Sequence, residues 1–192
     1  MAWCTWCFGA RYKEESHVPL KELPQVLLDS NKLGTDCVLV KNGKRVCGTG
    51  AVLANAPIAQ NKAYFEVKVQ CGGIWGVGLA TDRCQLDVVP QGQDTNTWVL
   101  RSDGTVCHNN EVLHRIDPAP VESDIVGCSY DHVELNIFVN GKSIQFPITG
   151  IRGRVYPLFY VDDAAILDVI FTDFIYPAPE GFEQIMFEQN IL

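Results

Sequence analysis

The sequence reads YFEVKV at Tyr64–Val69 and then GIWGVGLA at Gly73–Ala80, and these two runs decide the fold. In the first run, apolar residues fall on every second position, which is the period of a half-buried strand. In the second run, Gly76 and Gly78 share one face of a strand, so that face stays bare where something packs closely. The two runs predict successive strands of a buried sheet. Such a scaffold favours binding over catalysis.

Turn signals recur between short apolar runs in the rest of the chain. Asn-Gly and Asp-Gly pairs suit the positive φ angles of tight hairpin turns. They predict hairpins over residues 37–47, 98–107 and 133–146, and further strands are expected at 124–129, 155–160 and 165–171. In the last hairpin, alternate residues from Val133 to Val139 are expected to share one face. Many short strands with little helix predict an all-β fold, a β-sandwich.

Length and composition fit a single domain. The chain has 192 residues, of which 47% are hydrophobic, and this is enough for a sizeable core. The sequence shows no internal repeat and no linker. We predict a domain over residues 17–192 that includes a short C-terminal extension, and a flexible N-terminal tail over residues 1–16. The last ten residues are the one stretch whose apolar spacing allows a helix.

The charge balance excludes some classes of partner. The net charge is -8, whereas a general nucleic-acid binder needs a basic stripe that displaces counterions from phosphates. Anionic membrane surfaces are disfavoured for the same reason. Small basic clusters at residues 41–45 and 152–154 lie beside predicted turns and are interpreted as solvated loop surface. We therefore expect no nucleic-acid partner.

The sequence shows neither a transmembrane segment nor an export signal, so we expect a cytoplasmic protein. No run approaches the length of about eighteen apolar residues that a transmembrane helix needs, and the N-terminus lacks a signal-peptide pattern. The eight cysteines are then expected to be free thiols. Five of them lie in or beside apolar runs, where a free cysteine behaves as a small hydrophobic residue. They are Cys37, Cys47, Cys71, Cys107 and Cys128.

Redox, metal and nucleotide motifs all lack their required context. Cys4 and Cys7 match the letters W-C-x-x-C of a thioredoxin-like site, but no strand precedes them to place a thiol at a helix N-terminus. The same pair has no second pair of zinc ligands at close spacing. The Gly-x-Gly runs at 48–50 and 76–78 lack the third glycine of a dinucleotide site. We expect no metal and no cofactor.

Pairs that suggest catalysis also fail on geometry. Cys107 and His108 are adjacent strand residues and so point to opposite faces. The same alternation separates His132 from Ser129 and Asp131. We therefore predict a protein with no catalytic residues and no small-molecule substrate, which is not an enzyme.

Five motifs carry a resemblance to a known family: Tyr64-Phe65-Glu66-Val67, Trp75–Ala80, Asp124–Cys128 with Asp131, Ile137–Gly141 and Tyr156-Pro157. Through these motifs the chain resembles the SPRY family over most of its length. The resemblance implies a bent, two-sheet antiparallel β-sandwich of the concanavalin-like jelly-roll kind, without catalysis or cofactor. It also implies that loops at one end capture a partner protein or peptide.

The resemblance also implies a location for the partner-binding site. In relatives that bind short peptides, three segments build this site. The matching residues here are Asn55 and Pro57, then Gln93, Asp94 and Asn96, and finally Asp162 and Asp163. Those relatives carry an aromatic or apolar residue in the last segment, whereas this chain carries two aspartates, so a basic or hydrogen-bond-donating ligand is expected. The alternative is that both aspartates cap a turn.

The function expected from the sequence is a small cytoplasmic protein-interaction module whose partner is an unidentified protein or peptide. An alternative from another class is a peripheral membrane protein that is palmitoylated at Cys4 and Cys7, with the folded domain binding cargo. A single acyl chain anchors a protein only marginally, and the start Met-Ala lacks a myristoylation signal. A thiol enzyme is a distant third reading.

Overall fold

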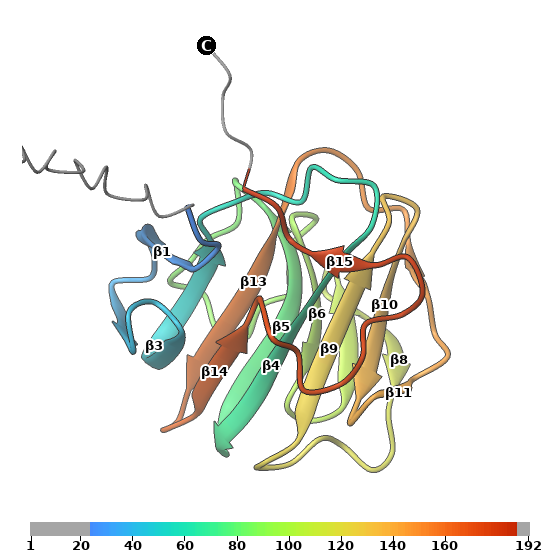
Figure 1. The fold of residues 1–192 in the computed structure, drawn as a ribbon. Coiled ribbons are helices and arrows are strands. Elements are labelled where there is room, and N and C mark those ends of the chain that lie inside the picture. Colours follow the sequence, from blue (N-terminus) through green and yellow to red (C-terminus); the bar gives the residue numbers. More distant parts are fainter. Residues whose placement is uncertain (1–23, 188–192) are drawn as a thin grey trace, which may run out of the picture.

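The computed structural model describes residues 24–187, and this range forms strands without a helix (Figure 1). The predictions on the tail over residues 1–16, on its boundary with the domain and on Cys4 and Cys7 lie outside the described residues. The strands are β1 (Leu28–Leu33), β2 (Asp36–Val40), β3 (Arg45–Ala54), β4 (Ala63–Cys71), β5 (Ile74–Thr81), β6 (Thr97–Arg101), β7 (Thr105–His108), β8 (Glu111–Arg115), β9 (Ile125–Tyr130), β10 (Glu134–Val139), β11 (Lys142–Ser143), β12 (Ile148–Thr149), β13 (Val155–Asp162), β14 (Ile166–Ile170) and β15 (Glu183–Gln184).

The strands form one continuous hydrogen-bonded sheet that curls on itself. Its order is β11-β10-β9-β4-β14-β3-β13-β5-β6-β7-β8, and all neighbours are antiparallel except β15, which pairs in parallel with β4. β3 belongs to both parts of the curl, because its first residues pair with β14 and its last with β13. The all-β prediction is confirmed. The predicted pair of separate sheets is replaced by two halves joined through β3, here called the β4 half and the β13 half.

The main core lies between these two halves. Phe65 on β4 meets Phe159 on β13 edge to face, with ring centroids 5.8 Å apart. Phe171, which follows β14, packs against both rings. Phe65, Val67 and Val69 are fully buried against this core, as the sequence pattern predicts, but the strand is not half-buried, because Tyr64 and Glu66 on its opposite face are buried too. Such contacts across the core stabilise the curl, because each fully buried large apolar side chain contributes about 1.5 to 3 kcal/mol.

The bare face of β5 is also explained. Tyr160 of β13 lies directly over Gly76, where any larger side chain would collide with its ring. Gly78 lies equally close to the backbone of Trp98 on β6. Tyr160 belongs to a second apolar cluster on the outer face of the β13 half, which the loop over residues 82–96 covers with Leu86 and other apolar side chains. The loop is fixed there by a hydrogen bond from the Ala51 N–H to the Leu86 carbonyl at 2.7 Å.

Some sequence-based expectations are wrong in detail. Val133 is exposed, because β10 begins only at Glu134. The Asp131 side chain accepts hydrogen bonds from the backbone N–H groups of Val133 and Glu134 and so holds Val133 in a tight bend. Cys47 and Cys71 are partly exposed rather than core residues. The described part of the last ten residues, 183–187, contains both residues of β15 and no helix.

Candidate partner-binding surface

The predicted acidic loop is a tight turn at the end of β13. Asp163 and Ala164 have φ angles of 47° and 62°, and the Ala165 N–H donates to the Asp162 carbonyl at 3.0 Å. Aspartate adopts this left-handed conformation more readily than most residues. The turn exposes Asp163 beyond the end of β13.

The β4–β5 turn packs against this acidic loop. Ile74 is the register partner of Asp162 in the β5–β13 ladder. Gly73, with φ of 130°, lies so close to the loop that a Cβ atom there would stand 2.8 Å from the Ala165 nitrogen. The two turns, far apart in the sequence, therefore form one continuous surface.

A hollow of about 370 Å³ opens beside Gly73. Its lining residues are Gly72, Gly73, Trp75, Ser102, Asp103, Pro120, Val121 and Glu122. Two carboxylates and no basic side chain are among them. Val121 is 63% exposed, and Ile74 is also exposed nearby. We call the region formed by Ile74, Asp103, Val121, Glu122, Asp162 and Asp163 the acidic surface.

The carboxylates of the acidic surface differ in whether they already accept hydrogen bonds from other residues of the protein. Burial pushes the pKa of Asp103 upward, but hydrogen bonds from Thr105 and the nearby arginines outweigh this and hold it below its usual range. Asp162 accepts a hydrogen bond from the Thr49 hydroxyl at 2.9 Å. Within residues 24–187 no hydrogen bond to the Asp163 carboxylate is found, so that group is available to a ligand.

The other two predicted segments lie at the opposite end of β13. The Ile58 N–H, next to Pro57, donates to the Val155 carbonyl at 2.9 Å. Val155 is the register partner of Thr81, whose N–H donates to the Asn96 carbonyl at 2.9 Å. Val155 and Asp162 are seven residues apart on one strand, or about 23 Å at 3.3 Å per residue. The structure thus brings two of the three segments together and leaves the acidic loop at the other end.

The polar side chains of those two segments already make hydrogen bonds within the protein. Asn55 accepts a hydrogen bond from the Leu27 N–H and donates one to the Gln25 carbonyl, both at 3.1 Å. Asp94 accepts a hydrogen bond from the Asn96 N–H at 2.9 Å. Asn96 in turn accepts one from the Thr81 hydroxyl at 2.9 Å. Gln93 is exposed and donates to the Pro90 carbonyl at 2.9 Å. Binding by these residues stays a prediction.

The suspected catalytic pairs are engaged in structural contacts. Cys107 is buried, with its thiol 3.4 Å from the Thr105 hydroxyl. His108 stacks on Trp98 with ring centroids 4.6 Å apart, and its Nδ1 lies 2.9 Å from the Thr97 carbonyl oxygen. Over the described range, no group of three or more His, Cys, Asp or Glu side chains is placed to hold a metal ion. The same range contains no helix long and apolar enough to cross a membrane.

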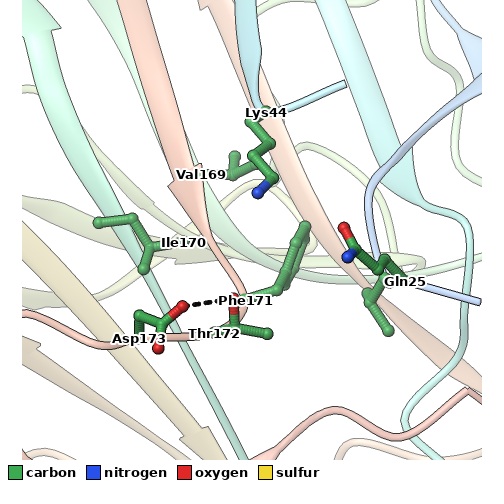
Figure 2. Close-up of a pocket in the computed structure, with 8 residues that line it drawn as sticks. Gln25, Lys44, Val169, Ile170, Phe171, Thr172 and Asp173 are labelled. Carbon is green, nitrogen blue, oxygen red and sulfur yellow. Dashed lines mark hydrogen bonds between the residues drawn. The ribbon is translucent and has the colours of Figure 1, made fainter. Parts of the chain in front are cut away.

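A further cavity of about 220 Å³ lies where the first described residues meet the end of β14 (Figure 2). Lys44 and Asp173 contribute one charge of each sign to its lining. Figure 2 shows Asp173 turned toward the Thr172 hydroxyl, which lies 3.4 Å from the carboxylate. Lacking a dominant charge or a set of metal ligands, this cavity is a weaker candidate than the acidic surface.

The fold agrees with what comparison of the sequence shows: the chain belongs to the SPRY domain family, whose model matches residues 62–173. SPRY domains are generally non-catalytic protein-interaction modules. Among its relatives is SPRY domain-containing protein 7. The chain is 53% identical to that protein of Gallus gallus over 188 residues, covering 97% of this chain and 94% of the relative. It is 52% identical to that of Mus musculus over the full length of both.

Solved structures support the fold alone. The SPRY domain of human HERC1 superposes with a TM-score of 0.62 at 16% identity, covering 77% of this chain and 99% of that one. The TRIM65 PSpry domain gives a TM-score of 0.62 at 13% identity, covering 77% of this chain and 90% of that one.

Sequence reasoning missed part of the acidic surface. Asp103, Val121 and Glu122 lie in segments far from Asp163 along the chain, and no local motif marks them. Only the Gly72-Gly73 pair could have indicated that another segment packs on this turn, because two glycines in a turn allow another backbone to approach closely.

Proposed function

We propose that this chain is a non-catalytic protein-interaction module that binds a basic segment of a partner protein on the acidic surface. One observation carries the proposal: the turn that carries the exposed Asp163 packs through its backbone on Gly73, which lines a hollow together with Asp103, Glu122 and the exposed Val121. A peptide that combines Lys or Arg with an apolar residue complements this pattern. Each charge-assisted hydrogen bond would add about 1.5 to 3 kcal/mol.

We also propose that the protein is cytoplasmic. The six cysteines of the described range are all unpaired. Free thiols are typical of a compartment whose glutathione keeps them reduced.

A displayed library of random peptides tests the binding mode. We expect wild-type protein to select peptides with Lys or Arg next to an apolar residue. Replacing Asp162 and Asp163 together by Asn removes two charges and keeps their size, so affinity should fall at least several-fold, about 1 kcal/mol or more. Binding should also weaken as salt rises.

The matched control removes the same charge elsewhere. Asp82→Asn with Glu183→Gln changes two exposed carboxylates at the ends of β5 and β4 that lie far from the acidic surface. This control should bind the selected peptides like wild type. The proposal fails if the library yields no basic peptides, or if both double variants bind them equally well.

A further inference from the structure

Within residues 24–187, β2 is an edge strand with an open outer side. It pairs with β3 in a regular register from Asp36↔Thr49 to Val40↔Arg45. No other described strand pairs with it. In an antiparallel ladder every second residue turns its N–H and C=O away from the partner strand, so an edge strand carries a row of unpaired backbone groups. β2 therefore offers a template for one more strand.

The other described edges are protected. The β7–β8 ladder has a register shift at Val106/Cys107, and His114 of β8 stacks on Phe146 with ring centroids 4.6 Å apart. The β1–β3 ladder is also irregular, and β11, β12 and β15 have two residues each. Proteins blunt edges with bulges, short strands, proline or lysine, and the five residues of β2 carry none of these.

The outward side chains of β2 are apolar in the middle and oppositely charged at the two ends. Val38 and Val40 are 51% and 39% exposed. The exposed Asp36 begins the strand, and Lys41 follows it directly. Lys41 shares the carboxylate of Asp168 with Arg45, so two cations face one anion and one positive charge remains uncompensated.

From this pattern we propose that β2 is a self-association surface, through which two copies of the chain pair antiparallel about a two-fold axis at Val38. Opposite residues of an antiparallel pair share a face of the sheet. The axis sets Val38 opposite Val38 of the second copy. It also sets Asp36 of each copy opposite Val40 of the other copy, where Lys41 and Arg45 lie next to Val40. A slip of one residue would set outward Val38 against inward Leu39, so the face pattern excludes such a slip.

Charge identifies a second copy as the occupant. The net charge of -8 disfavours association of two chains at most surfaces. At β2, however, the two-fold axis brings the acidic end of each strand to the basic end of the other. A two-fold contact must be self-complementary, and the run from Asp36 to Lys41 meets this condition. This inference goes beyond partner binding, because the dimer would carry two acidic surfaces.

Sedimentation velocity of the full chain, from low to high micromolar concentration, tests the inference. Wild type should shift reversibly from monomer to dimer, since a five-residue edge forms only a small interface. Val38→Lys and Val38→Asp each set two like charges at the axis, so each should weaken the dimer about tenfold or more. An equal mixture of these two variants sets opposite charges there and should recover a heterodimer.

A matched control uses the other long edge. Val112 is 57% exposed on β8, so Val112→Lys adds the same charge to an edge strand that we do not propose as a contact. This variant should dimerise like wild type. The inference is overturned if wild type stays monomeric throughout the range, if Val38→Lys dimerises like wild type, or if the mixture of the two Val38 variants stays monomeric.

Discussion

At the residue scale, the Asp168 side chain joins β14 to β3 and to the turn that follows β2. It lies on β14, between Arg45 of β3 and Lys68 of β4 in register. It binds the Arg45 guanidinium through both oxygens and also Lys41 at 3.0 Å. Burial alone would raise the pKa of Asp168, but these hydrogen bonds outweigh burial and hold it below its usual range.

The lowered pKa of Asp168 predicts a pH-dependent contribution to stability. A carboxyl with a lower pKa in the folded state stabilises the fold above its ordinary pKa of about 3.9, and that contribution is lost as the pH falls through the folded value. Asp168→Asn should therefore lower the free energy of unfolding by about 1 kcal/mol at neutral pH. In urea denaturation the difference from wild type should vanish in acid. A difference that stays constant down to low pH would contradict this account.

The cysteines should react in an order set by burial and pKa. Cys47 and Cys71 are partly exposed and should react first with an alkylating reagent. Burial, with Asp94 adding to it, raises the pKa of Cys84 to about 11, so its rate should rise about tenfold per pH unit up to that value. Cys37 and Cys128 are buried, and burial raises the pKa values of their thiols, so they should be alkylated only after the protein unfolds. Mass spectrometry after brief labelling checks the order, and early reaction at Cys128 would refute it.

At the element scale, hairpins were predictable and the packing of distant segments was not. The Asn42-Gly43 and Asp103-Gly104 turns specify their hairpins locally, because few residues other than glycine and asparagine accept positive φ angles. Glu66 looked like an outward, solvated residue of β4, yet it is fully buried. The segment that covers it follows more than a hundred residues later. No local pattern encodes such a contact, and the same holds for Glu122 near Asp163.

Glu66 anchors the C-terminal segment over residues 172–187 on the outer face of the β4 half. Figure 1 shows this segment crossing the sheet, with β15 beside β4. The carboxylate accepts hydrogen bonds from the Ile175 N–H at 2.7 Å and the Tyr176 N–H at 3.0 Å. The Tyr64 hydroxyl donates a third at 3.0 Å.

Removing this anchor should loosen the segment. Glu66→Ala leaves three donors without their acceptor, and each unsatisfied buried group costs about 1 to 3 kcal/mol, so we expect a loss of at least about 2 kcal/mol in unfolding free energy. Amide exchange at Ile175 and Tyr176 should accelerate. Glu183→Ala, an exposed change on the same segment, is the control and should alter neither quantity. Unchanged exchange in Glu66→Ala would mean that other contacts hold the segment.

At the scale of the whole molecule, β3 couples the two halves of the curled sheet. The strand bends where Gly48 and Gly50 have φ angles of 94° and 129°. A Cβ atom at Gly50 would stand 3.1 Å from the Leu86 carbonyl oxygen and 3.2 Å from the Cys37 sulfur. The bend therefore holds β2, the loop over residues 82–96 and both halves in one arrangement. One continuous core implies that the halves unfold together.

Gly50→Ala tests this coupling. The left-handed backbone and the close neighbours should cost about 1 to 3 kcal/mol of unfolding free energy. Because β3 belongs to both halves, global amide exchange should accelerate by the same factor in β5 and in β9, which lie in different halves. Gly150→Ala is the matched control: its φ angle is 81°, but the space around it is open, so its cost should be smaller. Acceleration confined to β5 would show that the halves unfold independently and that β3 links them without making them cooperative.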